Sequence, residues 1–275
     1  MSKKGLKTPL RYPGGKSRAC TKMGQFFPEL REYVEFREPF LGGGSVAIHV
    51  SKLYPHLKIT VNDLYEPLIN FWMNLQMFGD ELTKELKNLK ITNCNQDSAR
   101  CLFAEMKDVI NDSTHTDLER AVAFYVVNKC SFSGLTESSS FSAQASDSNF
   151  SMRGINKLTS YMKIIKNWKI TNLSYEELLV GDDDSFIYLD PPYEIGSNLY
   201  GKKGAMHKGF DHDIFFTNCD ISHQRCLISY NTTQVIKNRF LNWTASEFDL
   251  TYTMRSVGDY MNDQKHRKEL LLSNY

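Results

Sequence analysis

The sequence predicts an α/β protein in which helices flank a largely parallel sheet, with a helical insertion in the middle of the chain. From residue 33 the chain alternates twice between a strand pattern and a helix pattern. Two consecutive β-α units of this kind imply parallel strands. Residues 80–128 then show helical periodicity without any strand pattern, and this break in the alternation predicts the insertion.

Each element follows from the local hydrophobic period. Strands are predicted at 33–40, 57–63, 169–174, 185–189, 225–231, 242–250 and 267–275, and helices at 45–54, 64–78, 116–128 and 155–168. Thr116 is the expected N-cap of the third of these helices, with Glu119 as its capping-box partner. Residues 131–154 are rich in serine and glycine, too polar for a core, and predict a functional or mobile loop. We therefore expect a sheet domain formed by 1–74 and 157–275, interrupted by an insertion over 75–156 that recognises a ligand.

Composition places the chain among ordinary globular proteins, since 41% of its 275 residues are hydrophobic and 24% are charged. A net charge of +1 argues against indiscriminate coating of nucleic acid, although lysines and arginines cluster in residues 1–22 and 200–209. The six cysteines show no metal-ligand spacing, so no metal is expected. Without a signal sequence or an apolar stretch of membrane-spanning length, we expect a cytoplasmic protein with no membrane partner and no required protein partner.

A glycine-rich turn lies between the first predicted strand and helix, in the segment "EPFLGGGSVA". Gly42, Gly43 and Gly44 allow the backbone to approach a ligand and direct the helix N-terminus towards it. Asp63, at the tip of the next strand, is positioned to accept hydrogen bonds from ribose hydroxyls. The pattern suits a tight structural turn, a nicotinamide dinucleotide or the adenosyl part of S-adenosylmethionine.

The segment "LRYPGGKSRAC" contains Gly-Lys-Ser but is not a nucleotide-binding P-loop. That motif requires a glycine five residues before Gly15, where this chain has Leu10, and a preceding strand, which is not predicted here. Two interpretations remain, namely a basic turn with a solvated lysine, or a loop that closes over a ligand with Tyr12 and Lys16 pointing inward.

The segment "DPPY" follows the buried strand at 185–189 and suits the activation of an exocyclic amine. Such an amine is a poor nucleophile because its lone pair is delocalised into the ring. Asp190 and the carbonyl of Pro191 can accept its two hydrogens and expose the lone pair to an electrophile. Pro191 and Pro192 fix the backbone, and Tyr193 offers a face for a base extruded from a duplex. The alternative is a plain Asp-Pro-Pro turn with a surface tyrosine.

Taken in order, six segments resemble the Dam-type adenine-N6 DNA methyltransferases of bacteria and phages, the alpha group or D12 class. These segments are "RYPGGKS", "EPFLGGGSV", "VNDLYEPLINFW", "DPPY", "LISYNTT" and "KHRKELLLSNY", and they span nearly the whole chain. The resemblance implies a class I S-adenosylmethionine-dependent methyltransferase fold, a Rossmann-like mixed sheet flanked by helices, with a target-recognition insertion. It also implies S-adenosylmethionine as methyl donor and double-stranded DNA as substrate.

The resemblance assigns roles to individual positions. It implies a catalytic set of Asp190, Pro191, Pro192 and Tyr193. It implies a cofactor-binding set of Tyr12, Pro13, Gly14, Gly15, Lys16, Phe40, Gly42, Gly44, Asp63, Ser174, Tyr175 and Asp190. It implies a DNA-binding set of Asn128, Lys129, Gly134, Arg153, Asn198, Tyr200, Lys202 and Lys203.

The insertion departs from the family pattern at Lys129 and Ser133, and "TESSSFSAQASDSNF" lacks the basic and aromatic hairpin typical of a GATC reader. Since side chains on base edges read sequence, no particular target site is predicted. Cytosine N4, RNA adenine and protein glutamine are alternative methyl acceptors. Asp190 favours adenine over cytosine and glutamine, but adenine in RNA stays an alternative. A silent DNA-binding subunit and a nicotinamide dehydrogenase are further alternatives, and the intact DPPY segment argues against both.

Overall fold

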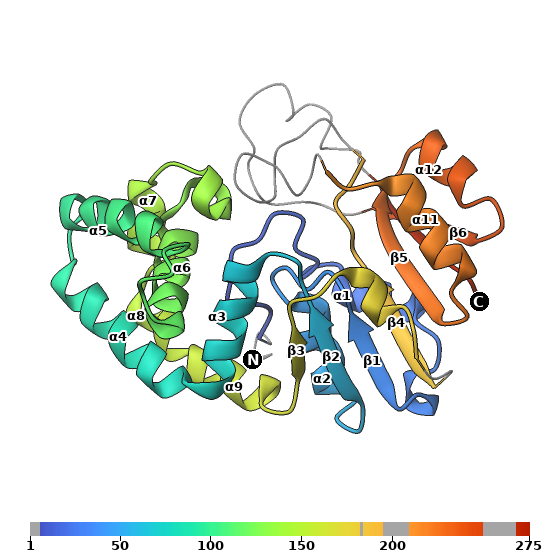
Figure 1. The fold of residues 1–275 in the computed structure, drawn as a ribbon, viewed down its shortest axis with the longest axis horizontal. Helices are drawn as coiled ribbons and strands as arrows, with labels where there is room; N and C mark the ends of the chain where they lie inside the picture. The colour runs from blue at the N-terminus through green and yellow to red at the C-terminus, as the bar shows by residue number, and fades with distance from the viewer. Residues whose placement is uncertain (1–5, 182–183, 195–208, 250–267) are drawn as a thin grey trace.

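The computed structural model describes residues 6–181, 184–194, 209–249 and 268–275, and within them seven strands form one sheet (Figure 1). The strand order is β3-β2-β1-β4-β5-β7-β6. The strands are β1 (Glu35–Glu38), β2 (Lys58–Asn62), β3 (Lys169–Thr171), β4 (Ser185–Leu189), β5 (Arg225–Asn231), β6 (Thr244–Asp249) and β7 (Lys268–Ser273). Every strand that the sequence predicts is therefore present, and the α/β class is confirmed.

The sheet is mixed. Strands β1 to β5 run parallel, while β7 lies between β5 and β6 and is antiparallel to both. The register places Phe36 of β1 between Ile59 of β2 and Phe186 of β4, and all three side chains are buried. Strand β4 is buried along its whole length, as expected of a central strand covered on both faces.

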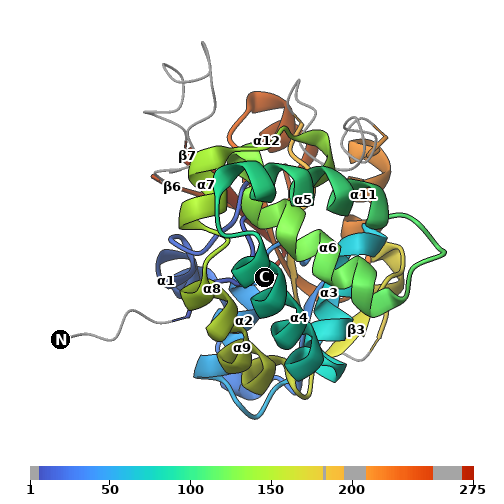
Figure 2. The same cartoon turned by 90° about the vertical axis from the view of Figure 1, so that its left-hand side faces the viewer.

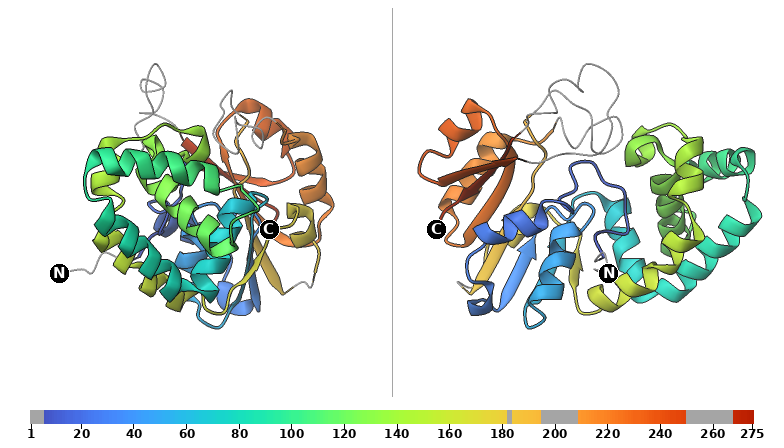
Figure 3. Two further views of the ribbon diagram at one scale, coloured as in Figure 1. Left: turned by 60° about the vertical axis from the view of Figure 1, so that its left-hand side comes forward. Right: turned by 180° about the vertical axis from the view of Figure 1, so that it is seen from behind.

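Helices flank the sheet, with α1 and α2 on one face and α11 on the other (Figures 1 and 3). The helices beside the sheet are α1 (Cys20–Met23), α2 (Ser45–Leu53), α3 (Glu66–Met77), α9 (Leu158–Ile165), α11 (His212–Ile221) and α12 (Gln234–Arg239). Helices α1, α11 and α12 were not predicted from the sequence. Helix α11 begins at a clear signal, because the Asp211 carboxylate accepts hydrogen bonds from the backbone N–H groups of Asp213 and Ile214. A helix there also fits the crossover that two adjacent parallel strands require.

The helical insertion forms a lobe beside the β3 edge of the sheet (Figures 1 and 2). It comprises α4 (Gly79–Thr92), α5 (Gln96–Val109), α6 (Asp117–Cys130), α7 (Ala143–Ser148) and α8 (Met152–Asn156). Thr116 and Glu119 form the predicted capping box at the start of α6. The predicted boundary at residues 74 and 75 falls inside α3, which packs against α6, and the division into two domains stays a prediction.

Residues 131–154 are more ordered than a loop. They contain the short 3-10 helices η3 (Phe132–Gly134) and η4 (Thr136–Ser138), then α7 and the start of α8, and Ser131 pairs with Phe141 in an isolated antiparallel bridge. Phe150 is fully buried and Ser146 is inaccessible as well. Ser142 caps α7 and Ser151 caps α8, so these serine side chains satisfy backbone N–H groups of the polar segment.

Every helix in the described segments is too short or too polar to cross a membrane.

Candidate active site

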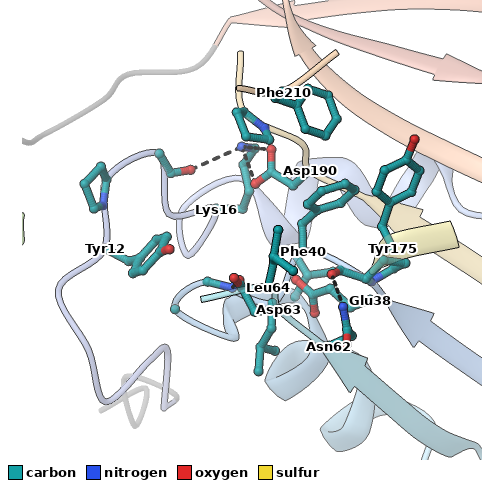
Figure 4. Close-up of a pocket in the computed structure, with 18 of the residues that line it drawn as sticks. Tyr12, Lys16, Glu38, Phe40, Asn62, Asp63, Leu64, Tyr175, Asp190 and Phe210 are labelled. Carbon is teal, nitrogen blue, oxygen red and sulfur yellow. Dashed lines mark hydrogen bonds and ion pairs between the residues drawn. The ribbon is translucent and has the colours of Figure 1, made fainter. Parts of the chain in front are cut away.

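A cavity of about 320 Å³ lies at the edge of the sheet where β1, β2 and β4 end. The strand order reverses at β1, which pairs with both β2 and β4, and open α/β sheets bind ligands at such a point. The predicted site residues that line this cavity are Tyr12, Pro13, Gly14, Gly15, Lys16, Phe40, Gly42, Asp63, Ser174, Tyr175, Asp190 and Pro192. Figure 4 shows Lys16 and Asp190 between Tyr12 on the N-terminal loop and the aromatic rings of Phe40 and Tyr175.

The glycine turn admits two aromatic rings of the protein itself. Gly42 and Gly44 have φ angles of +48° and +66°, which side chains with a Cβ rarely adopt. A Cβ on Gly42 would lie 2.8 Å from the Tyr12 ring, and a Cβ on Gly44 would lie 2.8 Å from the Trp72 ring. Gly44 is the N-cap of α2 and does not line the cavity. Glycine is therefore needed at position 44 to leave room for the Trp72 ring, and not for contact with a ligand in the cavity.

Buried acids line the base of the cavity. Asp63, at the end of β2, accepts hydrogen bonds from the backbone N–H groups of Gly42 (2.9 Å) and Tyr65 (3.0 Å). Burial raises the pKa of Asp63 to about 6. Glu38, at the end of β1, is 3% exposed, accepts a 2.7 Å hydrogen bond from the Ala47 N–H and has its pKa raised by burial. Glu38 was not among the predicted site residues, although it immediately precedes Pro39 and Phe40 at the end of a predicted strand.

An aromatic wall faces these acids. Phe40 and Tyr175 are stacked with ring centroids 5.4 Å apart, and Phe210 meets the edge of Phe40 at 5.8 Å. Phe210 lines the cavity and was not predicted as a site residue. The signal available in the sequence was an aromatic residue at the end of the basic segment before α11.

Lys16 and Asp190 form a buried ion pair at the C-terminal end of β4. The Lys16 Nζ lies 2.7 and 2.8 Å from the two Asp190 carboxylate oxygens, and 3.3 Å from Oε1 of Glu269 on β7. Lys16 is only 2% exposed and Glu269 only 1%, while the Asp190 side chain keeps 21% exposure. Burial raises the pKa of Asp190 to about 6, with the Lys16 charge opposing and the Glu269 charge adding to the rise. Glu269 was not among the predicted site residues.

The other two members of the DPPY segment do not line the cavity. Pro191 is buried behind it. The Tyr193 hydroxyl donates a hydrogen bond to Glu269, and its ring lies 5.0 Å from the Lys16 Nζ and 5.9 Å from the Tyr230 ring. Tyr193 is thus held by the same carboxylate that contacts Lys16.

The end of α6 holds the N-terminal loop in place. Asn128 is fully buried, and its side-chain amide makes two hydrogen bonds with the Arg11 backbone, one from the Arg11 N–H (2.9 Å) and one to the Arg11 carbonyl (2.7 Å). The Arg11 guanidinium donates to the Ser131 carbonyl at 2.6 Å. Gly134 has a φ of +73°, and a Cβ there would lie 2.7 Å from Arg11. Two predicted DNA-binding residues, Asn128 and Gly134, therefore contact the loop instead of an open surface.

The remaining predicted DNA-binding residues differ in their surroundings. Lys129 is 9% exposed, its Nζ lies 5.2 Å from the Tyr125 ring, and burial lowers its pKa to about 7. Arg153 is exposed on α8. The rest of the set lies outside the described residues, namely Asn198, Tyr200, Lys202 and Lys203.

The sheet order, the antiparallel β7 and the cavity at the carboxyl edge are those of the class I methyltransferase fold. The model of the family "D12 class N6 adenine-specific DNA methyltransferase" matches residues 12–254, and the chain belongs to this family. It is an enzyme that methylates adenine in DNA at N6.

Relatives of the chain carry related descriptions. Type II methyltransferase M.MjaIII of Methanocaldococcus jannaschii is 25% identical over 69% of this chain and 70% of its own length. Type II methyltransferase M1.LlaDCHI of Lactococcus lactis subsp. cremoris is 21% identical over 100% of this chain and 97% of its own. The DNA N-6-adenine-methyltransferase of Escherichia phage P1 is 26% identical over 70% of this chain but only 24% of its own length.

Proposed function

We propose that the enzyme transfers the methyl group of S-adenosylmethionine to N6 of an adenine that has been extruded from duplex DNA into this cavity. The observation that carries the proposal is the position of Asp190. Its carboxylate borders the cavity directly after the buried strand β4, beside the rigid Pro191-Pro192 pair and in contact with Lys16. A family of N6 adenine-specific enzymes requires an acceptor for amine hydrogens, and this carboxylate fits that requirement.

The lining of the cavity fits S-adenosylmethionine. The acids Glu38, Asp63 and Asp190 suit a ligand with a positively charged sulfur and an ammonium group, and the rings of Phe40 and Tyr175 suit an adenine. When bound, this cofactor supplies an electrophilic methyl group. A cavity of about 320 Å³ is within the usual range for ligands of this size.

We assign each cofactor-binding residue by its position around the cavity. Asp63, at the end of β2, would hold the ribose hydroxyls, and Ser174 and Tyr175 would lie beside the adenine. The N-terminal loop would cover the bound cofactor with Tyr12, Pro13, Gly14, Gly15 and Lys16. Because Gly42 has no side chain, the Tyr12 ring can pack directly against the backbone of the glycine turn, which favours closure of the N-terminal loop.

Asp190 is the residue of this chain that we assign to activation of the amine. One of its oxygens and the Pro191 carbonyl accept the two hydrogens of the N6 amine, so that the lone pair is directed at the methyl group. As the amine takes the methyl group from sulfur, the sulfur keeps the electron pair of the broken bond and the nitrogen becomes positively charged. The nitrogen must then lose one of its two hydrogens as a proton, and Asp190, whose pKa is about 6, is placed to accept it. Tyr193 is assigned to stack on the target base. Alignment and electrostatic support supply the acceleration, without a covalent enzyme intermediate.

We propose that residues 75–156 read the DNA target, with phosphate contacts setting the register before any base is read. Arg153 is exposed on this lobe, and Lys129 lies near the loop that covers the cofactor. Asn198, Tyr200, Lys202 and Lys203 are assigned to the DNA on the basis of the basic character of their segment. Asn128 and Gly134 are assigned to support of the N-terminal loop.

The test uses methyl-labelled S-adenosylmethionine, purified protein and a plasmid of mixed sequence, followed by nucleoside analysis. Label should appear in N6-methyladenine with the wild-type protein and be absent with Asp190→Ala, while cofactor binding by the variant stays within about threefold of wild type. Label in another nucleoside would overturn the assignment of the acceptor. Transfer by Asp190→Ala at the wild-type rate would overturn the assigned role of Asp190.

A further inference from the structure

One ammonium group is shared by two carboxylates beside the cavity. Lys16 contacts both oxygens of Asp190 at 2.7 and 2.8 Å and Oε1 of Glu269 at 3.3 Å, and it also donates to the Gly14 carbonyl at 3.2 Å. The two carboxylates come from different parts of the sheet, since Asp190 follows β4 and Glu269 is in β7. The shorter contacts show that Lys16 is paired chiefly with Asp190 in this state.

The two carboxylates differ in their access to a ligand. Asp190 lines the cavity and its side chain is 21% exposed, whereas Glu269 does not line it and is 1% exposed. An amine that enters the cavity can therefore reach Asp190 only. Both Asp190 oxygens already accept hydrogen bonds from Lys16, so the amine and the ammonium compete for the same acceptor.

Lys16 cannot simply give up this pairing. Its side chain is 2% exposed, and a buried charge without a partner is strongly unfavourable. Glu269 offers a second acceptor at 3.3 Å, so a small shift of Nζ keeps the ammonium paired while it releases an Asp190 oxygen. The lysine stem is long and flexible enough for such a shift.

We propose that Glu269 is a positioning residue that takes over the Lys16 ammonium when the target amine binds Asp190. This inference rests on the proposed function, and it concerns the step between entry of the base and methyl transfer. With Lys16 held on Glu269, the negative charge of Asp190 faces the amine without the competing ammonium. In the absence of a base, the ammonium returns to Asp190 and occupies the acceptor.

Tyr193 links this exchange to the assigned stacking position. Its hydroxyl donates to Glu269, and its ring lies 5.0 Å from the Lys16 Nζ. Removal of Glu269 therefore has two effects to be separated, namely loss of the second acceptor for Lys16 and loss of the hydrogen bond that orients Tyr193. Tyr193→Phe keeps the ring and leaves Glu269 available to Lys16, and it removes only the hydroxyl, which contacts Glu269 and also Asp190.

The test measures single-turnover methyl transfer to plasmid DNA together with the affinity for S-adenosylmethionine. Glu269→Gln should lower the transfer rate at saturating DNA at least tenfold, with cofactor affinity within about threefold of wild type. Glu269→Asp, which keeps a carboxylate, should recover part of the rate. Tyr193→Phe should be clearly less impaired than Glu269→Gln. A wild-type rate for Glu269→Gln, or equal impairment of Tyr193→Phe and Glu269→Gln, would overturn the inference.

A second comparison keeps the test decisive if Glu269→Gln alone does not fold. The double variant Lys16→Met/Glu269→Gln removes both charges, and Asp190 loses its ammonium partner in this variant as it does in Lys16→Met alone. If Glu269 acts through Lys16, the double variant should transfer as fast as Lys16→Met alone, because coupled residues are not additive. A further tenfold loss in the double variant would contradict the inference. Absence of label in adenine with the wild-type protein would instead refute the proposed function.

Discussion

Replacement of Asn128 by alanine should weaken cofactor binding although this residue does not line the cavity. The substitution removes the two hydrogen bonds, of 2.9 and 2.7 Å, between the Asn128 amide and the Arg11 backbone. It leaves a backbone N–H and a backbone carbonyl in a partly buried position without these partners, at a cost of about 1 kcal/mol each. If the free energy of the ordered loop conformation rises by about 2 kcal/mol, the dissociation constant for S-adenosylmethionine should rise roughly 30-fold.

The assay is calorimetric titration of each variant with S-adenosylmethionine, with DNA affinity and the melting temperature measured in parallel. Asn88→Ala is the matched control, because Asn88 is an exposed asparagine within helix α4, and both affinities should be unchanged. Cofactor affinity that stays at the wild-type value in Asn128→Ala while DNA affinity falls would refute the reasoning. That result would return Asn128 to a direct role in DNA binding.

Three further predictions concern packing, titration and helix capping. Gly44→Ala should lower the free energy of unfolding by about 2 to 4 kcal/mol, because its φ of +66° is unfavourable for alanine and the new Cβ would meet the Trp72 indole ring. Gly24→Ala is the control, since its new Cβ meets nothing within 4 Å, and its melting temperature should equal that of the wild-type protein within experimental error. The transfer rate should rise with pH through an apparent midpoint near the Asp190 pKa of about 6, since only the ionised carboxylate accepts amine hydrogens. Lys16→Met should move this midpoint to higher pH, because the lysine charge lowers the pKa of Asp190. A rate that does not change over this pH range would contradict the role of Asp190. Thr116→Ala should cost about 1 kcal/mol of stability through loss of the capping box without changing the transfer rate of the folded enzyme, as judged by urea unfolding and the labelling assay.

The strands could be predicted from the sequence because each is a short run with a clear hydrophobic pattern. The buried run over 185–189 and the acid that follows it are enough to place Asp190 at the edge of the sheet. Helices α11 and α12 were not predicted because they are short and lie between strong strand signals. The better indication of a helix at α11 is that β4 and β5 are parallel neighbours and need a crossover connection.

The parts of the site that sequence could not predict depend on contacts across the fold. Glu269 approaches Lys16 only because β7 lies beside β5 in the sheet, and nothing near residue 269 indicates this neighbour. Asn128 matched a family motif, but the sequence could not indicate that its amide turns inward to the Arg11 backbone. Long-range pairings of this kind are set by the tertiary structure and leave no local periodicity.

The position of β7 has a consequence for the biosynthesis of the enzyme. In the sequence this strand follows the six other strands of the described residues, yet it lies between β5 and β6, which make no ladder with each other. A nascent chain that has emerged from the ribosome only as far as β6 has no β7 with which to join that strand to the sheet, and it lacks the Glu269 carboxylate at the site. The catalytic centre is therefore completed by β7, which is translated after the six other described strands, so a product truncated before β7 retains the glycine turn and Asp190 but lacks Glu269.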